Sequence, residues 1–207
     1  MAHTEGWGFG YRNGKHHTYL RKGMWEVEFA TMKHPKEKRV ISLYENSRSF
    51  IYGKLNSMYV LRGSYGVQRV LNQKPYWGGV ELRWFFYGGA SLAITKPVYL
   101  YIVKFNEQTE QQDVVVERYN PYEHTVDVIY GRGPFFKGFD LLRFHPGLYA
   151  KTGLNFEYGT TDALLKSLEC GATLDYYPFP VTLMAFNDQQ SFFLSFYLSL
   201  HLGKRKN

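Results

Sequence analysis

The sequence predicts an all-β protein, a single antiparallel up-and-down transmembrane β-barrel of about eight strands. The strongest observation is the segment Ser191–Gly203, where every second position from Phe192 to Leu202 is apolar. The alternate positions are small, polar or aromatic. Successive side chains of a strand point to opposite faces, so one face of this segment is wholly apolar. A soluble strand needs only about 5–6 residues, whereas a membrane-crossing barrel strand needs about 9–11.

Composition is the second observation. Aromatic residues make up 18% of the 207 residues, with 18 Tyr and 16 Phe, as expected of a barrel with aromatic girdles. Mean hydropathy is -0.37 and no 18 apolar residues run together, which argues against a transmembrane helix. The net charge of +7 favours phosphate-rich partners. Cys170 is the single cysteine, so the chain has no internal disulfide framework.

Alternating strands follow one another through the first half of the chain. The first is Gly6–Arg12, with three aromatic residues on one face and mainly glycine on the other. The next expected strands are Met24–Met32, Met58–Val70, Gly79–Phe86 and Ser91–Val103. Turns are expected at Asn72–Pro75 and at the paired glycines of Tyr87–Gly89. Whether residues 79–103 form one strand or two stays open.

A long loop, Lys104–Pro146, interrupts the pattern. Loops above about 12–15 residues without secondary structure tend to be functional or disordered. Its phenylalanines provide enough apolar surface for a plug, a cap or a docking patch for another protein. The alternation resumes in Leu148–Tyr158, Leu168–Tyr177 and Ser191–Gly203, which brings the expected number of strands to about eight.

The faces that alternate with the apolar ones carry charges of both signs. We expect these residues to form a polar network in the barrel lumen: Arg12, Glu26, Glu28, Arg62, Glu81, Arg83, Lys151, Glu157, Glu169, Asp175 and His201. The interior of an eight-stranded barrel is narrow, so its charges must be paired. The alternative is a soluble β-sandwich or a lipocalin-like binding protein, in which the less apolar face meets water.

Several motifs, taken together, resemble an uncharacterised family of small outer-membrane β-barrels from Bacteroidota. They are His3–Arg12, Met32–Glu37, Gly53–Asn56, Lys96–Leu100, Gly131–Phe139 and Leu198–Arg205. The resemblance covers nearly the whole chain, so residues 1–207 are expected to form one domain. It implies a location in the cell outer membrane. It also implies a truncated N-terminus, with the chain beginning part-way into its first strand, because members extend further there. The resemblance implies no particular activity. The N-terminal residues show no signal peptide.

Two segments are candidates for contact with a partner protein or with membrane lipid, including lipopolysaccharide. Their residues are Lys33, His34, Lys36, Lys38, Arg39, Arg132, Phe135, Phe136 and Lys137. A solvated loop past a strand end, with Pro35 ending the ladder, is the simpler explanation of the first segment. Gly131–Phe139 lacks the order of a phosphate-binding P-loop. Nucleic acid is not expected as a partner, because the basic run lacks interleaved aromatics for stacking.

Catalysis has weak support in the sequence. None of the seven histidines has metal-ligand spacing, so we expect no metal, no cofactor and no catalytic residue. Ser199 and His201 share a strand face, but such neighbours lie about 6.6–7 Å apart, too far for a nucleophile–base hydrogen bond. We therefore expect a non-enzymatic structural or accessory component of an envelope assembly or secretion complex, contacting another envelope protein through residues 104–146. The alternative function is an outer-membrane lipid-modifying enzyme.

Overall fold

The computed structural model describes the chain except residues 19, 43, 45–46, 74–78, 107–110, 159–163 and 205–207. The second half of the expected Asn72–Pro75 turn and the end of the Leu198–Arg205 motif lie outside the described residues. Strands dominate the described part, which contains only two short 3₁₀ helices, η1 (Val126–Val128) and η2 (Phe139–Leu141). The expected all-β class is confirmed.

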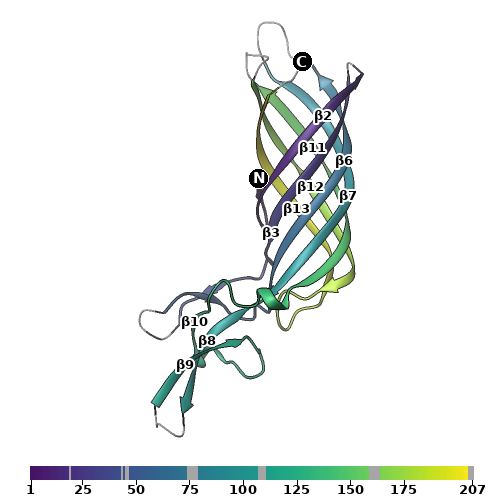
Figure 1. Cartoon of the computed structure of the whole chain (residues 1–207). Helices are drawn as coiled ribbons and strands as arrows, with labels where there is room; N and C mark the ends of the chain where they lie inside the picture. The colour runs from purple at the N-terminus through teal and green to yellow at the C-terminus, as the bar shows by residue number, and fades with distance from the viewer. Residues whose placement is uncertain are drawn as a thin grey trace.

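Eight antiparallel strands of the described chain close into a barrel in the order β1-β13-β12-β11-β7-β6-β3-β2 (Figure 1). Their bounds are β1 Ala2–His3, β2 Gly6–Thr18, β3 Arg21–Met32, β6 Asn56–Asn72, β7 Glu81–Pro97, β11 Arg143–Tyr158, β12 Leu164–Val181 and β13 Gln190–Lys204. All but β1 are 12–18 residues long, and they tilt around the barrel axis. Such lengths exceed those of ordinary soluble strands.

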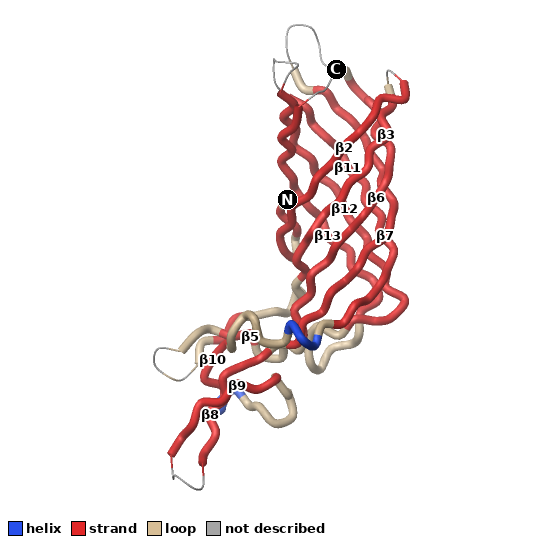
Figure 2. Tube along the Cα trace, viewed as in Figure 1, coloured by secondary structure: helices blue, strands red, loops and turns tan. Residues whose placement is uncertain are grey.

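A smaller β-structure lies beyond one end of the barrel (Figure 2). Its three-stranded sheet, here called the end sheet, has the order β10-β8-β9. The strands are β8 Tyr99–Asn106, β9 Gln111–Arg118 and β10 Ile129–Arg132, and a separate pair joins β4 Arg39–Val40 to β5 Phe50–Ile51. Phe50, Leu100, Ile102, Tyr119 and Ile129 form a buried core between these elements.

Two sequence-based expectations are wrong around β7. Tyr87–Gly89 is no turn, because Gly88 and Gly89 pair with β6 on one side and β11 on the other. A Cβ atom on Gly89 would lie 2.0 Å from the carbonyl oxygen of Gly63, so glycine there permits close strand approach. The expected strand Ser91–Val103 is instead divided between β7, which ends at Pro97, and β8. The eighth barrel strand is β1.

The segment Lys104–Pro146 is not a loop without secondary structure. It contains β9, β10, both 3₁₀ helices, the end of β8 and the start of β11. The sequence of this segment shows no sustained alternation because β9 and β10 are short and only partly buried. Since the segment builds the end sheet beyond the barrel, the plug interpretation is wrong for its described residues (Figure 2).

The two faces of the barrel wall differ sharply. Along β13 the even-numbered residues point outward and are exposed, whereas Phe193, Ser195, Tyr197 and Ser199 are buried inside. The contrast between neighbours is large: Leu198 is 52% exposed and Ser199 only 2%. Outward aromatic rings also contact one another across strands, as Phe9 does with Phe29 at 5.4 Å between centroids. The outside is apolar and the inside is largely polar.

Candidate functional site: the charged interior of the barrel

Arg62 on β6 is the centre of the first ionic cluster. Its guanidinium donates two hydrogen bonds to Asp175 on β12, at 3.1 and 2.6 Å, and one to Glu28 on β3 at 2.6 Å. All three side chains are almost fully buried. The guanidinium carbon also lies 4.8 Å from the centroid of the Tyr149 ring. Strand alternation brings these residues to one level of the lumen from three separate strands.

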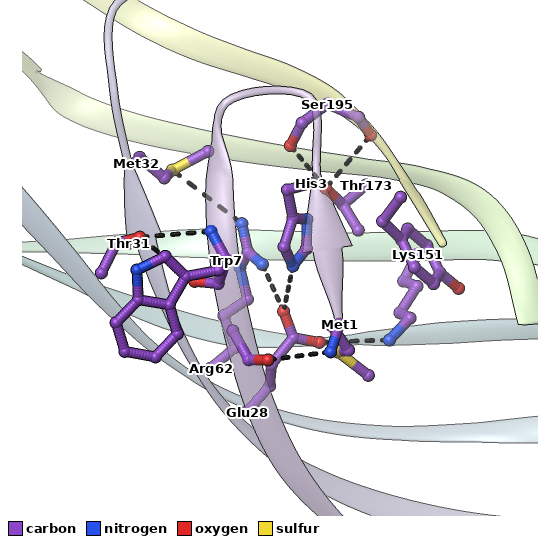
Figure 3. A network of polar contacts seen from close by, with 12 residues as sticks. Met1, His3, Trp7, Glu28, Thr31, Met32, Arg62, Lys151, Thr173 and Ser195 are labelled. Carbon is purple, nitrogen blue, oxygen red and sulfur yellow. Dashed lines mark hydrogen bonds and ion pairs between the residues drawn. The ribbon is translucent and has the colours of Figure 1, made fainter. Parts of the chain in front are cut away.

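Lys151 on β11 joins this cluster to a second one, and Figure 3 shows its contact with Glu28. Its ammonium group lies 3.0 Å from Glu26, 3.1 Å from Glu28 and 3.7 Å from Glu169. Arg12 on β2 donates to both oxygens of Glu169, at 2.6 and 2.9 Å, and to Glu26 at 2.9 Å. Each buried carboxylate therefore has a cationic partner, as a desolvated charge requires.

The third cluster lies around Arg83 on β7. Its guanidinium is 2.7 Å from Glu81 and 2.6 Å from Glu157. These carboxylates are more accessible than those of the other clusters. The structure thus places every expected lumen residue inside the barrel, including His201, whose Nε2 lies 3.6 Å from Glu169.

Sequence reasoning missed several members of the network. His3 Nε2 lies 3.4 Å from Glu28 (Figure 3), and the Tyr197 hydroxyl donates to Glu169 at 2.8 Å. Asn155 donates to Glu169 at 3.2 Å and to Ser167 at 3.1 Å. Tyr197, Asn155 and Ser167 have the same strand parity as the predicted residues, so alternation contained the signal. β1 is too short for any period to reveal His3.

Apolar side chains fill the lumen beside the charges. Phe85, Tyr87 and Tyr197 form one buried cluster, and Tyr87 lies under the Arg12 guanidinium at 4.9 Å. Nearer the end sheet, Met32, Met58, Val60, Tyr177 and Phe193 belong to a second buried cluster. Because aromatic and apolar side chains pack directly against the ionic clusters, as Tyr197 does against Glu169, the interior is filled in the way small barrels require.

The basic run after β3 is an ordered turn at the end of the barrel next to the end sheet. Glu37 accepts a hydrogen bond from the His34 backbone N–H at 3.1 Å and lies 2.7 Å from the Lys54 ammonium. Burial and the charge of Lys36 lower the pKa of His34. The exposed cations of the run are Lys33, Lys36, Lys38 and Arg39.

The second candidate segment, Arg132–Lys137, lies at the same end. Its phenylalanines Phe135 and Phe136 contact Phe139 and each other, and Phe136 is 84% exposed. Lys96 at the end of β7 donates to the carbonyl oxygen of Phe135 and lies 4.5 Å from its ring centroid. We call Phe135, Phe136 and Phe139 the aromatic cluster.

The two segments are electrostatically linked. Burial lowers the pKa of Lys54, and the nearby positive charges of Lys33 and Arg132 add to this effect. Lys33 belongs to the first segment and Arg132 to the second. Their cations therefore contribute to one positive region at this end of the barrel.

Ser199 and His201 do not form a nucleophile–base pair in the described structure. Ser199 Oγ lacks a hydrogen-bond partner there, and His201 approaches Glu169 rather than Ser199. No three described His, Cys, Asp or Glu side chains could together hold a metal ion. Within the same residues, no helix is long and apolar enough to cross a membrane.

Comparison with protein-family models, curated proteins and solved structures gives no match. The resemblance to small Bacteroidota outer-membrane barrels therefore stays a prediction.

Proposed function

We propose that this protein is an integral outer-membrane β-barrel without enzymatic activity, and that it serves as a structural or accessory component of an envelope assembly or secretion complex. The observation that carries the proposal is the polarity of the barrel wall. Long strands expose apolar residues outward and bury paired charges inward. A barrel in lipid needs this arrangement, because its outer band faces hydrocarbon.

A soluble β-sandwich or a lipocalin-like binding protein does not account for the apolar outer face and charged inner face of this wall. A lipocalin-type barrel holds its ligand inside and meets water outside. Here the lumen is occupied by ionic clusters, while Phe192, Leu194, Phe196, Leu198 and Leu200 are exposed on a single strand. Contiguous apolar surface of this kind marks a protein or membrane contact.

The end sheet and the aromatic cluster support an accessory role. They lie beyond the barrel end, where a partner or lipid headgroups can reach them (Figure 2). The aromatic cluster combines exposed rings with nearby Arg132 and Lys137, and aromatic and arginine side chains are enriched at protein interfaces. We propose that this surface contacts another envelope protein and that the neighbouring cations contact lipid phosphates, including those of lipopolysaccharide.

Flotation with liposomes after a urea wash tests membrane integration. The account predicts that the protein floats with the vesicles and that its gel mobility changes on heating, as a folded barrel resists detergent unfolding. A sample that stays monodisperse without detergent and remains at the bottom of the gradient would instead favour a soluble barrel.

Co-purification from native membranes tests the accessory role. We expect a stoichiometric partner with the wild-type protein and its loss with Phe136→Ser. Ile41→Ser is a matched control, because Ile41 is also exposed but lies outside residues 104–146 and outside the aromatic cluster. Lipid hydrolysis that depends on His201, measured with His201→Ala, would contradict the non-enzymatic part of the proposal.

A further inference from the structure

Exposed cations gather at one end of the outer barrel wall. This end lies opposite the end sheet, where β13 finishes near the C-terminus (Figure 1), and we call it the far end. Lys96, at the other end of the wall, also has outward parity, but it is buried and donates to the Phe135 carbonyl. In the described barrel strands, the exposed lysines and arginines with outward parity are Lys15, Arg21, Arg69, Lys166 and Lys204.

Three of these cations lie side by side on β2, β3 and β6. Arg21 of β3 is paired directly with Arg69 of β6, and Lys15 of β2 is paired with Gly23 of β3. Gly23 has no side chain to separate Lys15 from the two arginines. Opposite Cβ atoms in such a ladder lie about 4.5–5.5 Å apart and diagonal ones about 7–8 Å, so these long side chains can reach one common anion. We call Lys15, Arg21 and Arg69 the basic patch.

The basic patch has no carboxylate on its own face of the described barrel strands. The acidic residues of those strands have inward parity and form ion pairs in the lumen, as Glu26 does with Arg12. They are Glu26, Glu28, Glu81, Glu157, Glu169 and Asp175. Like charges directly opposite one another destabilise a sheet. The Arg21–Arg69 pair is therefore unfavourable unless an anion from outside the wall lies between the two guanidinium groups.

The wall is apolar immediately beside the basic patch. The next outward pairs of β3 and β6 are Gly23 with Val67 and Trp25 with Tyr65. Trp25, Tyr65 and Val67 are all exposed. A glycerophospholipid matches both features, because its phosphate can contact the cations while its acyl chains lie along the apolar pairs. A free phosphate ion matches only the first feature.

The lengths of the strand connections indicate which leaflet the far end occupies. At the far end the strand bounds leave residues 19–20, 73–80 and 159–163 between barrel strands. At the other end, residues 33–55 and 98–142 connect barrel strands and include the end sheet. Outer-membrane barrels have short periplasmic turns and longer extracellular loops. In a barrel of this kind the far end lies in the periplasmic leaflet, which consists of glycerophospholipids, and the end sheet lies on the lipopolysaccharide side.

We propose that the basic patch binds the phosphate of an anionic glycerophospholipid, such as phosphatidylglycerol, in the periplasmic leaflet of the outer membrane. Arg21 and Arg69 donate charge-assisted hydrogen bonds to the phosphate oxygens, and Lys15 adds a point charge. The bound phosphate offsets the repulsion between the arginines and so stabilises this part of the wall. The inference adds a lipid site to the proposed function and rests on it, because the patch meets lipid only if the barrel spans the membrane.

Native mass spectrometry of the whole protein, released from micelles of a neutral detergent, counts bound lipids directly. We expect the Arg21→Gln/Arg69→Gln variant to bind phosphatidylglycerol at least about tenfold more weakly than the wild type. Lys166→Gln/Lys204→Gln is a matched control, because it removes two outward cations of the far end that are not paired with each other. Its affinity should stay within about twofold of the wild type. Equal weakening in both variants would overturn the proposal by indicating general charge attraction.

Competing ligands distinguish the source of the phosphate. Phosphatidylglycerol should bind more tightly than phosphatidylcholine, lipid A or inorganic phosphate. Lipid A that binds as tightly would contradict the periplasmic leaflet, and inorganic phosphate that displaces the lipid at equal concentration would contradict a lipid site.

Unfolding temperature in the same detergent provides a second readout. Without lipid, Arg21→Gln/Arg69→Gln should unfold at the same temperature as the wild type or higher, because it removes like-charge repulsion. Added phosphatidylglycerol should stabilise the wild type more than this variant. A variant that unfolds at a lower temperature without lipid would overturn the repulsion argument and the proposal with it.

Failure of this inference is distinguishable from failure of the proposed function. Flotation with liposomes of phosphatidylcholine alone reports membrane integration without any anionic lipid. A protein that floats but does not prefer phosphatidylglycerol refutes the lipid site alone, whereas one that does not float refutes the membrane barrel.

Discussion

At the residue scale, the stability lost when a cation is removed depends on how deeply its carboxylate partners are buried. Arg62 is 1% exposed and is the cationic partner of both Asp175 and Glu28. Arg83 has a similar set of contacts, but its partners Glu81 and Glu157 are more accessible to water. Water can resolvate the second pair of carboxylates when the arginine is removed. The same substitution at the two positions should therefore differ in cost.

Arg62→Met is expected to lower the free energy of unfolding by about 3–5 kcal/mol, because it leaves buried carboxylates without their cation. Arg83→Met should cost clearly less. Urea titrations of both variants in the same detergent measure the difference. Equal losses would indicate that the two clusters are equally desolvated, against the structure.

Neighbouring residues on opposite faces of β13 provide a second comparison. Leu198→Arg should cost roughly 2–4 kcal/mol if this position lies near the bilayer midplane, since it places a charge on the lipid face. Ser199→Ala should cost much less, because the Ser199 hydroxyl has no hydrogen-bond partner among the described residues. Folding titrations into lipid vesicles measure both, and similar costs would mean that the faces are assigned wrongly.

At the element scale, Pro97 separates a barrel strand from a strand of the end sheet. Proline has no N–H for a ladder, and the pairing of β7 with β6 ends at this residue. The chain then enters β8, which pairs with β9 and β10. The β8–β9 hairpin carries an ion pair of its own between Lys104 and Glu117, at 2.6 Å.

That ion pair predicts a pH dependence of the hairpin. The hydrogen bond from Lys104 is the main cause that lowers the pKa of Glu117, and His124 lies 3.4 Å from its other oxygen. A carboxylate with a lowered pKa stabilises the folded form above its unfolded pKa, near 4.5, and this contribution is lost as pH falls through the lowered value. The protection factors of the β8–β9 amides, which are exchange rates corrected for the intrinsic effect of pH, should fall on acidification. In Glu117→Gln this part of the pH dependence should disappear.

Sequence alternation predicted much of the wall and the lumen, for a physical reason. A strand with one apolar outer face and one packed inner face must keep a period of two, and this period alone predicts that Arg62, Glu28 and Asp175 lie on the inner face. Alternation failed where period two is absent or ambiguous. β1 has two residues, paired glycines at Gly88 and Gly89 resemble a turn, and the end sheet depends on pairing between segments far apart in sequence.

At the scale of the whole molecule, a filled lumen predicts a barrel that does not conduct. Ionic clusters and buried apolar side chains together fill the interior, and the second apolar cluster includes Tyr177 and Phe193. Planar-bilayer recordings should show no measurable ion conductance. The Arg83→Met variant should also show no ion conductance, because the rest of the lumen stays filled with side chains. Steady conductance in the wild type would contradict the packed interior.

The central claim is that the apolar outer face of the barrel contacts lipid. The most direct measurement is spin-label accessibility along β13 in liposomes, with one nitroxide at a time from residue 194 to residue 200 in a Cys170→Ser background. The account predicts high collision with dissolved oxygen and low collision with a water-soluble nickel chelate at Leu194, Phe196, Leu198 and Leu200, and low collision with both at the odd positions. Strong collision of the even positions with the nickel chelate would contradict it, because those side chains would then face water.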